Sequence, residues 1–187
     1  MKTIIGIIGT VGSGKDTVAE YISNKLTIST FQISQPLKDI AKERGIKPTR
    51  ENLIKIGSDL VKENGAGFLV KLLVDKIPED LIIITGIRVT EVIDYIRKNY
   101  NLILLAITAE PKIRFKRCIL RNKLGEAKTL TEFIENEQKE NSPPNTQRLF
   151  ECLNLANYSI SNNDDLKILF QKVDEFLRLK KLSTLLN

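Results

Sequence analysis

The residues with the clearest chemical potential form the stretch Gly9-Thr10-Val11-Gly12-Ser13-Gly14-Lys15-Asp16-Thr17. Its spacing, G-x-x-x-x-G-K, is that of a phosphate-binding loop, in which glycine backbones let several amide groups turn toward one anion. A lysine at this place reaches the terminal phosphates of a bound nucleotide. An apolar run, Ile4 to Ile8, precedes the stretch, and an amphipathic pattern follows it. These flanks predict a P-loop between a strand and a helix, and the alternative is a glycine-rich turn without a ligand.

The residues after Lys15 decide how this loop would hold magnesium. In many P-loop proteins the serine or threonine directly after the lysine binds Mg²⁺. Here Asp16 stands in that position and the hydroxyl comes one residue later, at Thr17. We expect Thr17 to be the metal ligand, and a contribution of Asp16 through water is the alternative.

Three arginines form a second candidate group. Arg114, Arg117 and Arg121 are spaced i, i+3 and i+7, which places them on one face of one helix. The segment that follows, residues 122–147, is polar and highly charged, as expected of a lid. Arginines on a closing lid neutralise charge on a phosphoryl group in transfer while water is excluded. The alternative interpretation is a solvated basic helix face.

Arg50 and Arg88 form a third group, because both follow breaks that we expect at the carboxyl edge of a sheet. In open α/β sheets, ligands bind at that edge. The guanidinium group is a planar fork suited to a phosphate monoester. The pair is therefore predicted to hold the phosphate of an acceptor substrate, and surface ion pairs are the alternative.

The hydrophobic pattern predicts the elements that position these residues. Apolar strands are expected at residues 3–8, 28–33, 81–85, 102–107 and 158–161. Helices are expected at about 14–25, 36–44, 50–64, 68–77, 90–98, 111–121, 146–155 and 165–179, and a further short helix is expected after the capping box Thr129-x-x-Glu132. This alternation predicts the α/β P-loop NTP hydrolase fold, with about five parallel strands, helices on both faces and a small helical lid. We expect one domain, residues 1–187, with an acceptor-binding helical region at about 36–76 and a lid at about 122–147.

Composition narrows the possible chemistry. The sequence has no histidine, which excludes Ser-His-Asp and Cys-His catalysis and His-ligated metal centres. Phosphoryl transfer needs none, because Lys, Arg and Mg²⁺ supply its positioning and charge neutralisation. The net charge of +6 suits an anionic partner, but the basic residues are mixed with 23 acidic ones, so we expect small-molecule substrates and no nucleic-acid partner.

Targeting signals are not evident in the sequence. Lys2 is followed only by a short apolar run ending in glycine, and no apolar stretch approaches the roughly 20 residues of a membrane span. Cys118 and Cys152 stand apart without a CxxC motif, as is usual for reduced thiols. A cytoplasmic protein without membrane association is therefore expected.

Four stretches together resemble the archaeal-type P-loop kinases, relatives of adenylate kinase, dephospho-CoA kinase and the (deoxy)nucleoside monophosphate kinases. They are GTVGSGKDTVAEYI, TRENLIKIGSDL, IIITGIRVTEVIDYI and AEPKIRFKRCILR, and the likeness continues to ANYSISNNDDL near the C-terminus. The resemblance implies that ATP is the co-substrate with Mg²⁺, bound through Gly9, Gly12, Ser13, Gly14, Lys15, Asp16 and Thr17. It further implies that Arg50 and Arg88 hold the acceptor phosphate, that the three arginines 114, 117 and 121 belong to the lid, and that Asn162 lies near the adenine.

The sequence departs from these relatives at two places. They often carry an aspartate where this chain has Thr85, and an acidic residue near Ser34 and Gln35. Asp39 or Asp59 is a candidate for the missing carboxylate. The expected function is ATP-dependent phosphorylation of a small phosphorylated acceptor, and the simplest such acceptor is a nucleoside or deoxynucleoside monophosphate. Hydroxyl phosphorylation, as in dephospho-CoA kinase, and a nucleotide-binding regulatory ATPase without kinase activity are the alternatives.

Overall fold

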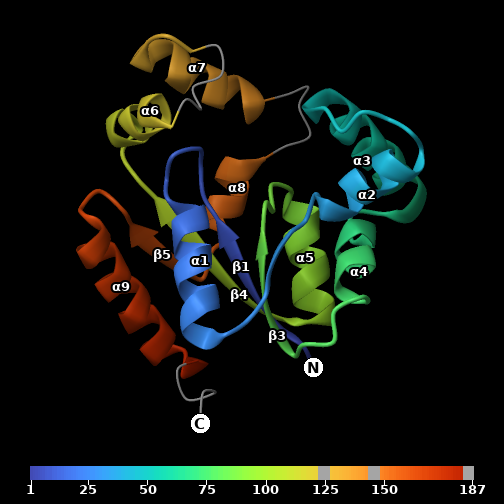
Figure 1. Cartoon of the computed structure of the whole chain (residues 1–187), viewed down its shortest axis with the longest axis horizontal. Coiled ribbons are helices and arrows are strands. Elements are labelled where there is room, and N and C mark those ends of the chain that lie inside the picture. The colour runs from blue at the N-terminus through green and yellow to red at the C-terminus, as the bar shows by residue number, and fades with distance from the viewer. Residues whose placement is uncertain (122–126, 143–147, 183–187) are drawn as a thin grey trace.

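A computed structural model describes residues 1–121, 127–142 and 148–182 of the chain. Within these residues the centre of the fold is one parallel sheet of five strands in the order β2-β3-β1-β4-β5 (Figure 1). The strands are β1 (Thr3–Ile8), β2 (Thr30–Gln32), β3 (Leu81–Thr85), β4 (Asn101–Thr108) and β5 (Tyr158–Ser161). The predicted α/β P-loop fold is confirmed.

The register of the sheet places the P-loop between two neighbouring connections. β1 is the central strand, with Ile7 level with Thr85 of β3 and Ile8 level with Ala106 of β4. The chain leaves all three strands at the same edge because they are parallel. The segment after β1, which contains Lys15, is therefore flanked by the segment that carries Arg88 and by the start of the helix that carries the arginine triplet.

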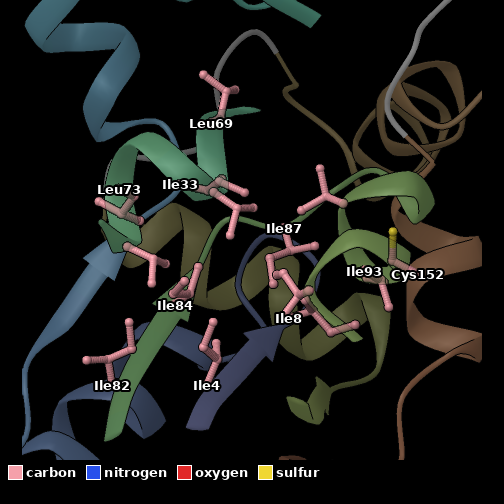
Figure 2. Packing of buried hydrophobic residues seen from close by; sticks show 14 of the residues in the cluster. Ile4, Ile8, Ile33, Leu69, Leu73, Ile82, Ile84, Ile87, Ile93 and Cys152 are labelled. Carbon is pink, nitrogen blue, oxygen red and sulfur yellow. The ribbon is translucent and has the colours of Figure 1, made fainter. Parts of the chain in front are cut away.

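Both faces of the sheet are covered, which explains why the central strands are continuously apolar. On one face Ile4, Ile8, Ile82 and Ile84 pack against helices that include Ile93 and Cys152 (Figure 2). On the other face, alternate residues of the same strands pack against the first and last helices. This second layer includes Ile5, Ile7, Ile83, Leu105, Ile22, Val173 and Phe176.

Nine helices lie within the described residues. They are α1 (Lys15–Leu26), α2 (Gln35–Glu43), α3 (Arg50–Asn64), α4 (Phe68–Val74), α5 (Thr90–Asn99), α6 (Pro111–Leu120), α7 (Leu130–Glu140), α8 (Leu149–Asn154) and α9 (Leu166–Leu179). The predicted caps are confirmed. Thr49 accepts from the amide of Asn52, and Thr129 and Glu132 form the full capping box of α7.

The differences from the expected elements are confined to ends. β2 is limited to three residues, since this edge strand pairs only with β3, from Thr30 level with Ile83 to Gln32 level with Thr85. α4 ends at Val74 rather than near Ile77, and α8 begins at Leu149. Part of the predicted start of α8, residues 146 and 147, lies outside the described residues.

Two groups of helices extend beyond the carboxyl edge of the sheet. In Figure 1, α6 and α7 stand on one side of the P-loop, and α2 and α3 stand on the other. α7 packs on α6 through a small apolar cluster of Phe115, Cys118, Ala127 and Phe133, separate from the two main layers. None of the helices in the described ranges is long and apolar enough to cross a membrane.

The thiol of Cys152 provides a test of the core around α8. It is fully buried, and burial, reinforced by the nearby Glu151 carboxylate, raises its pKa from 9.0 to about 11. Between these values the unfolded chain loses the thiol proton while the folded chain keeps it, so the free energy of unfolding falls as pH rises. We expect a loss of about 2 kcal/mol from pH 9 to 11.

Urea unfolding at several pH values measures this effect against Cys152→Ala as the reference. The variant has no thiol at this position, so the difference in unfolding free energy between the two proteins should shrink as pH rises. A difference that stays constant from pH 8 to pH 11 would mean that the folded protein tolerates a thiolate at this site.

Candidate phosphate-binding site

The P-loop has the backbone conformation of an anion-binding loop. Gly12 and Gly14 both have positive φ, 79° and 96°, and Gly14 precedes α1 as its N-cap. The first helical hydrogen bond runs from the Val18 amide to the Gly14 carbonyl at 3.0 Å. The amides of the first turn, residues 15–17, therefore lack an intrahelical acceptor, and no side chain caps them. Amides exposed in this way at the positive end of a helix form an anion site.

Each glycine of the motif lies against a neighbour that leaves no room for a side chain. A Cβ on Gly9 would lie 2.5 Å from the carbonyl oxygen of Ile107 in β4. On Gly12 it would lie 2.7 Å from the backbone oxygen of Arg114, and on Gly14 it would lie 2.3 Å from the side-chain nitrogen of Asn162. The motif glycines thus allow the loop to pack against β4, α6 and the turn after β5.

Gly12→Ala is expected to destabilise the fold by about 2–4 kcal/mol, from the positive φ and from the clash with the α6 backbone. The matched control is Gly45→Ala, where φ is also positive, 65°, but nothing lies within 4 Å of the added carbon. That control should lose only the conformational part, about 1–2 kcal/mol. Chemical denaturation of both variants gives the two values, and equal losses would show that the approach of Arg114 is not restrictive.

Arg114 is placed differently from the sequence-based expectation. Its side chain is buried between α6 and α7, where its two terminal nitrogens pair with both carboxylate oxygens of Glu137 at 2.6 and 2.7 Å. The same guanidinium donates to the carbonyls of Val11 at 3.2 Å and Ala109 at 3.0 Å. Its donors are thus directed at protein groups, so direct contact with a phosphoryl group, which we predicted, is not the role that this geometry favours.

Asn162 is also directed at the P-loop. Its side-chain nitrogen donates to the carbonyl of Ser13 at 2.7 Å, and its own amide donates to Thr108. The residue is 4% exposed. The structure thus places Asn162 against the P-loop, and its predicted position near the adenine stays a prediction.

Arg117 and Arg121 lie at the end of α6, next to each other. Arg117 donates to the backbone and side-chain oxygens of Asn162 at 3.0 and 3.3 Å. Burial and then the like charge of Arg121 lower the pKa of Arg117. Arg121 itself is exposed. The three arginines therefore share a helix, as predicted, but only the last one projects into solvent.

The groups around Lys15 are compatible with magnesium nucleotide. Lys15 pairs with the neighbouring Asp16 at 3.2 Å, and the Asp16 carboxylate is largely exposed. Thr17 is half-buried in the first turn of α1, and its hydroxyl has no hydrogen-bond partner among the described residues. The described parts of the chain contain no group of three or more Asp, Glu, Cys or His that would form a metal cage. Mg²⁺ in nucleotide sites needs only one or two protein ligands beside phosphate and water, so Thr17, with Asp16 nearby, fits.

The turn after β3 carries Arg88, one of the two predicted acceptor ligands. Gly86 in this turn has a positive φ of 84°, and half-buried Arg88 follows it. The carbonyl of Arg88 accepts from the amide of Arg148, which precedes α8, at 2.8 Å. The Arg148 side chain forms an ion pair with Glu91. Arg50, the other predicted acceptor ligand, is the first residue of α3, and its side chain lies outside what the structure describes.

Thr85 and Gln35, where the related kinases often carry acidic residues, both form hydrogen bonds with neighbouring residues. Thr85 is buried at the end of β3, and its hydroxyl points to the carbonyl of Phe31 at 3.5 Å. Gln35 donates to the carboxylate of Asp39 at 2.9 Å, on the exposed first turns of α2. Asp59 is exposed on α3. Asp39 and Asp59 are the two candidates for the missing carboxylate. Of these, Asp39 accepts a hydrogen bond, from Gln35 in the first turn of α2.

Sequence reasoning missed two residues of this region. Glu137 is one of several acidic residues in a charged helix, so nothing in its spacing distinguished it. Arg148 had a weak signal, as an arginine placed just after the predicted lid.

Comparison with known proteins agrees with this geometry. Residues 5–141, well over half of the chain, match the family described as AAA domain. A UPF0200 protein of Pyrococcus horikoshii is 32% identical over 168 residues, covering 86% of this chain and 88% of that protein. A UPF0200 protein of Pyrococcus abyssi is 28% identical and covers 94% of this chain and 95% of its own length.

Among solved structures, shikimate kinase from Acinetobacter baumannii in complex with shikimate has a similar fold. Its TM-score is 0.58 at 16% identity, and the alignment covers 100% of this chain and 97% of that one. Shikimate kinase from Aquifex aeolicus gives a TM-score of 0.53 at 17% identity, with 97% and 98% covered. At these identities the likeness establishes a kinase-like P-loop fold and no substrate. The chain thus belongs to the AAA domain family and to the UPF0200 proteins, with a P-loop that implies nucleotide binding.

Proposed function

We propose that the protein is an ATP-dependent phosphotransferase that acts on a small phosphorylated acceptor, a nucleoside or deoxynucleoside monophosphate being the simplest. The observation that carries the proposal is the placement of cationic groups on both sides of the P-loop at one edge of the sheet. Arg88 follows β3 on one side, and Arg117 and Arg121 lie on the helix after β4 on the other. The P-loop alone would be enough to bind one anion. Arginines on both sides of the loop indicate that a second anion binds next to the first.

The roles follow from position. Lys15 and the amides of the first turn of α1 bind the β- and γ-phosphates of ATP. Thr17 would hold Mg²⁺, which would supply charge neutralisation on these phosphates when bound. Arg88 and Arg50 hold the acceptor phosphate. The acceptor oxygen attacks the γ-phosphorus, the bond to the β–γ bridging oxygen breaks, and ADP leaves.

The lid residues form the third part of the proposal. We assign Arg121, and Arg117 behind it, to neutralising charge on the transferring group, because the exposed end of α6 carries two neighbouring cations. The two donors of Arg117 that contact Asn162 keep it beside the P-loop. The lid itself is proposed to span about 122–147, of which the structure describes 127–142.

Hydroxyl phosphorylation is a second candidate, and one observation favours it. A hydroxyl acceptor benefits from a carboxylate as a base, and the Gln35–Asp39 pair presents one at the start of α2. A shikimate kinase with a similar fold was solved in complex with shikimate. A monophosphate needs no base, because its attacking oxygen is already an anion.

A coupled assay of ADP formation tests these possibilities against a panel of acceptors. The panel contains the common nucleoside and deoxynucleoside monophosphates, dephospho-CoA and shikimate. We expect at least one monophosphate to raise ADP formation above the basal ATPase rate, with a phosphorylated product of the expected mass. Stimulation only by hydroxyl acceptors supports the second candidate. If no acceptor stimulates the enzyme and basal hydrolysis remains, a regulatory ATPase is the better description.

A further inference from the structure

The ion pair between Arg114 and Glu137 is largely enclosed by the protein. The side chains are 5% and 14% exposed, and the contact is bidentate. Arg114 also lies 5.4 Å from the ring centroid of Phe133. A charged pair this well buried is unusual on a small helical appendage, because desolvation opposes it unless other bonds satisfy its groups. Here one of the additional hydrogen bonds of Arg114 is to the carbonyl of Val11 in the P-loop.

The P-loop can cradle phosphate only if its amides point inward, and this orientation turns several of its carbonyls outward. Two of those carbonyls are held from outside the loop. Val11 accepts from Arg114 at 3.2 Å, and Ser13 accepts from Asn162 at 2.7 Å. The two accepting residues are sequence neighbours of Gly12 and Gly14, which are the loop residues with positive φ. The orientation of the intervening peptides is thereby fixed before any ligand arrives.

Glu137 connects this arrangement to the lid. Its helix, α7, is packed on α6 through Phe133 and starts with the capping box at Thr129. Near its other end, Asn141 donates to the carbonyl of Glu137 at 2.8 Å and accepts from the amide of Phe150 in α8 at 3.2 Å. α7 is thus held at both ends, and Glu137 directs Arg114 from a fixed place.

We propose that Glu137 and Arg114 are positioning residues for the P-loop, through which the lid helix sets the affinity for the polyphosphate of the nucleotide. Neither residue touches phosphate in this role. Glu137 holds the guanidinium of Arg114, Arg114 holds the carbonyl of Val11, and the adjoining amides keep the orientation that binds the anion. The inference rests on the proposed function only in that the P-loop binds a polyphosphate.

Glu137→Gln is the test, with Glu135→Gln as the matched control. Both residues lie on α7 and undergo the same chemical change, but Glu135 is exposed. Affinity is measured for Mg-ATP and for inorganic tripolyphosphate. We expect Glu137→Gln to weaken both by the same factor, about tenfold to hundredfold, as for the loss of one charge-assisted hydrogen bond. Glu135→Gln should stay within about twofold of the parent protein.

A merely structural role would lower thermal stability without a selective effect on polyphosphate. Amide hydrogen exchange of ligand-free protein separates the two roles, because it does not depend on binding or catalysis. We expect the P-loop peptide to exchange faster in Glu137→Gln than in Glu135→Gln, with α1 beyond its first turn and β1 unchanged. Equal exchange in both variants overturns the inference whatever the protein binds or catalyses.

The direction of the affinity change is also decisive. If Glu137→Gln binds tripolyphosphate more tightly, Arg114 is a phosphate ligand that Glu137 holds back, and the positioning role is wrong. If affinity falls as expected but no acceptor is phosphorylated by the parent protein, the positioning role stands and the proposed kinase reaction fails.

Discussion

Lys15→Ala is expected to lower kcat/KM for phosphoryl transfer by about a thousandfold, the scale observed when one preorganised charge is removed from a transition state. The lysine stands at the start of α1, beside the unpaired amides of the first turn. Among the residues that the structure describes, its ammonium group pairs only with the exposed carboxylate of Asp16. Because an exposed pair contributes little to stability, the variant should fold normally while the charge opposite the γ-phosphate is lost.

The measurement is steady-state ADP formation with the best acceptor found, accompanied by thermal unfolding. Lys98→Ala is the matched control, since this lysine is exposed at the end of α5, where the chain returns to the edge of the sheet opposite the P-loop. We expect the control to retain the parent rate and both variants to retain the parent melting temperature. A Lys15→Ala enzyme with a rate within tenfold of the parent would remove the P-loop from the catalytic site.

The fold could be predicted from the sequence because strands, helices and their caps depend on residues that are close together in the chain. Apolar strands and amphipathic helices are read from periodicity, and two predicted caps, Thr49 and Thr129, have the expected bonds. The P-loop was equally predictable. Gly12 and Gly14 have the positive φ that favours glycine, and Gly9 has neighbours too close for a side chain.

The hydrogen-bond and ion-pair partners of the site residues could not be predicted from the sequence, because they lie in segments that are distant along the chain. Arg114 and Glu137 are 23 residues apart, and Asn162 and Ser13 are 149 apart. Spacing placed the arginines of α6 on one face, but it could not show that α7 covers the first of them. This covering changes the chemistry, because a buried arginine with a bidentate partner stabilises a loop, whereas an exposed one such as Arg121 is free to meet a ligand.

Arg88→Ala is expected to raise the KM for the acceptor by about a hundredfold, while the KM for ATP stays within about threefold. The reason is the position of Arg88 after β3, on the opposite side of the P-loop from α6. The contact between its carbonyl and the Arg148 amide belongs to the backbone, so the variant keeps the connection to α8. Steady-state kinetics with each substrate varied in turn give the two constants.

Two further variants make this experiment specific. Arg88→Lys keeps the charge but loses the planar fork, so its KM for the acceptor should lie between those of the parent and Arg88→Ala. Arg178→Ala changes an exposed arginine on α9 and should match the parent. If Arg88→Ala raises both KM values equally, the arginine contributes to the donor site, and the acceptor phosphate must be held from elsewhere. Arg148 would then be the next residue to test, because it lies against the same turn and its partner Glu91 is exposed at the start of α5.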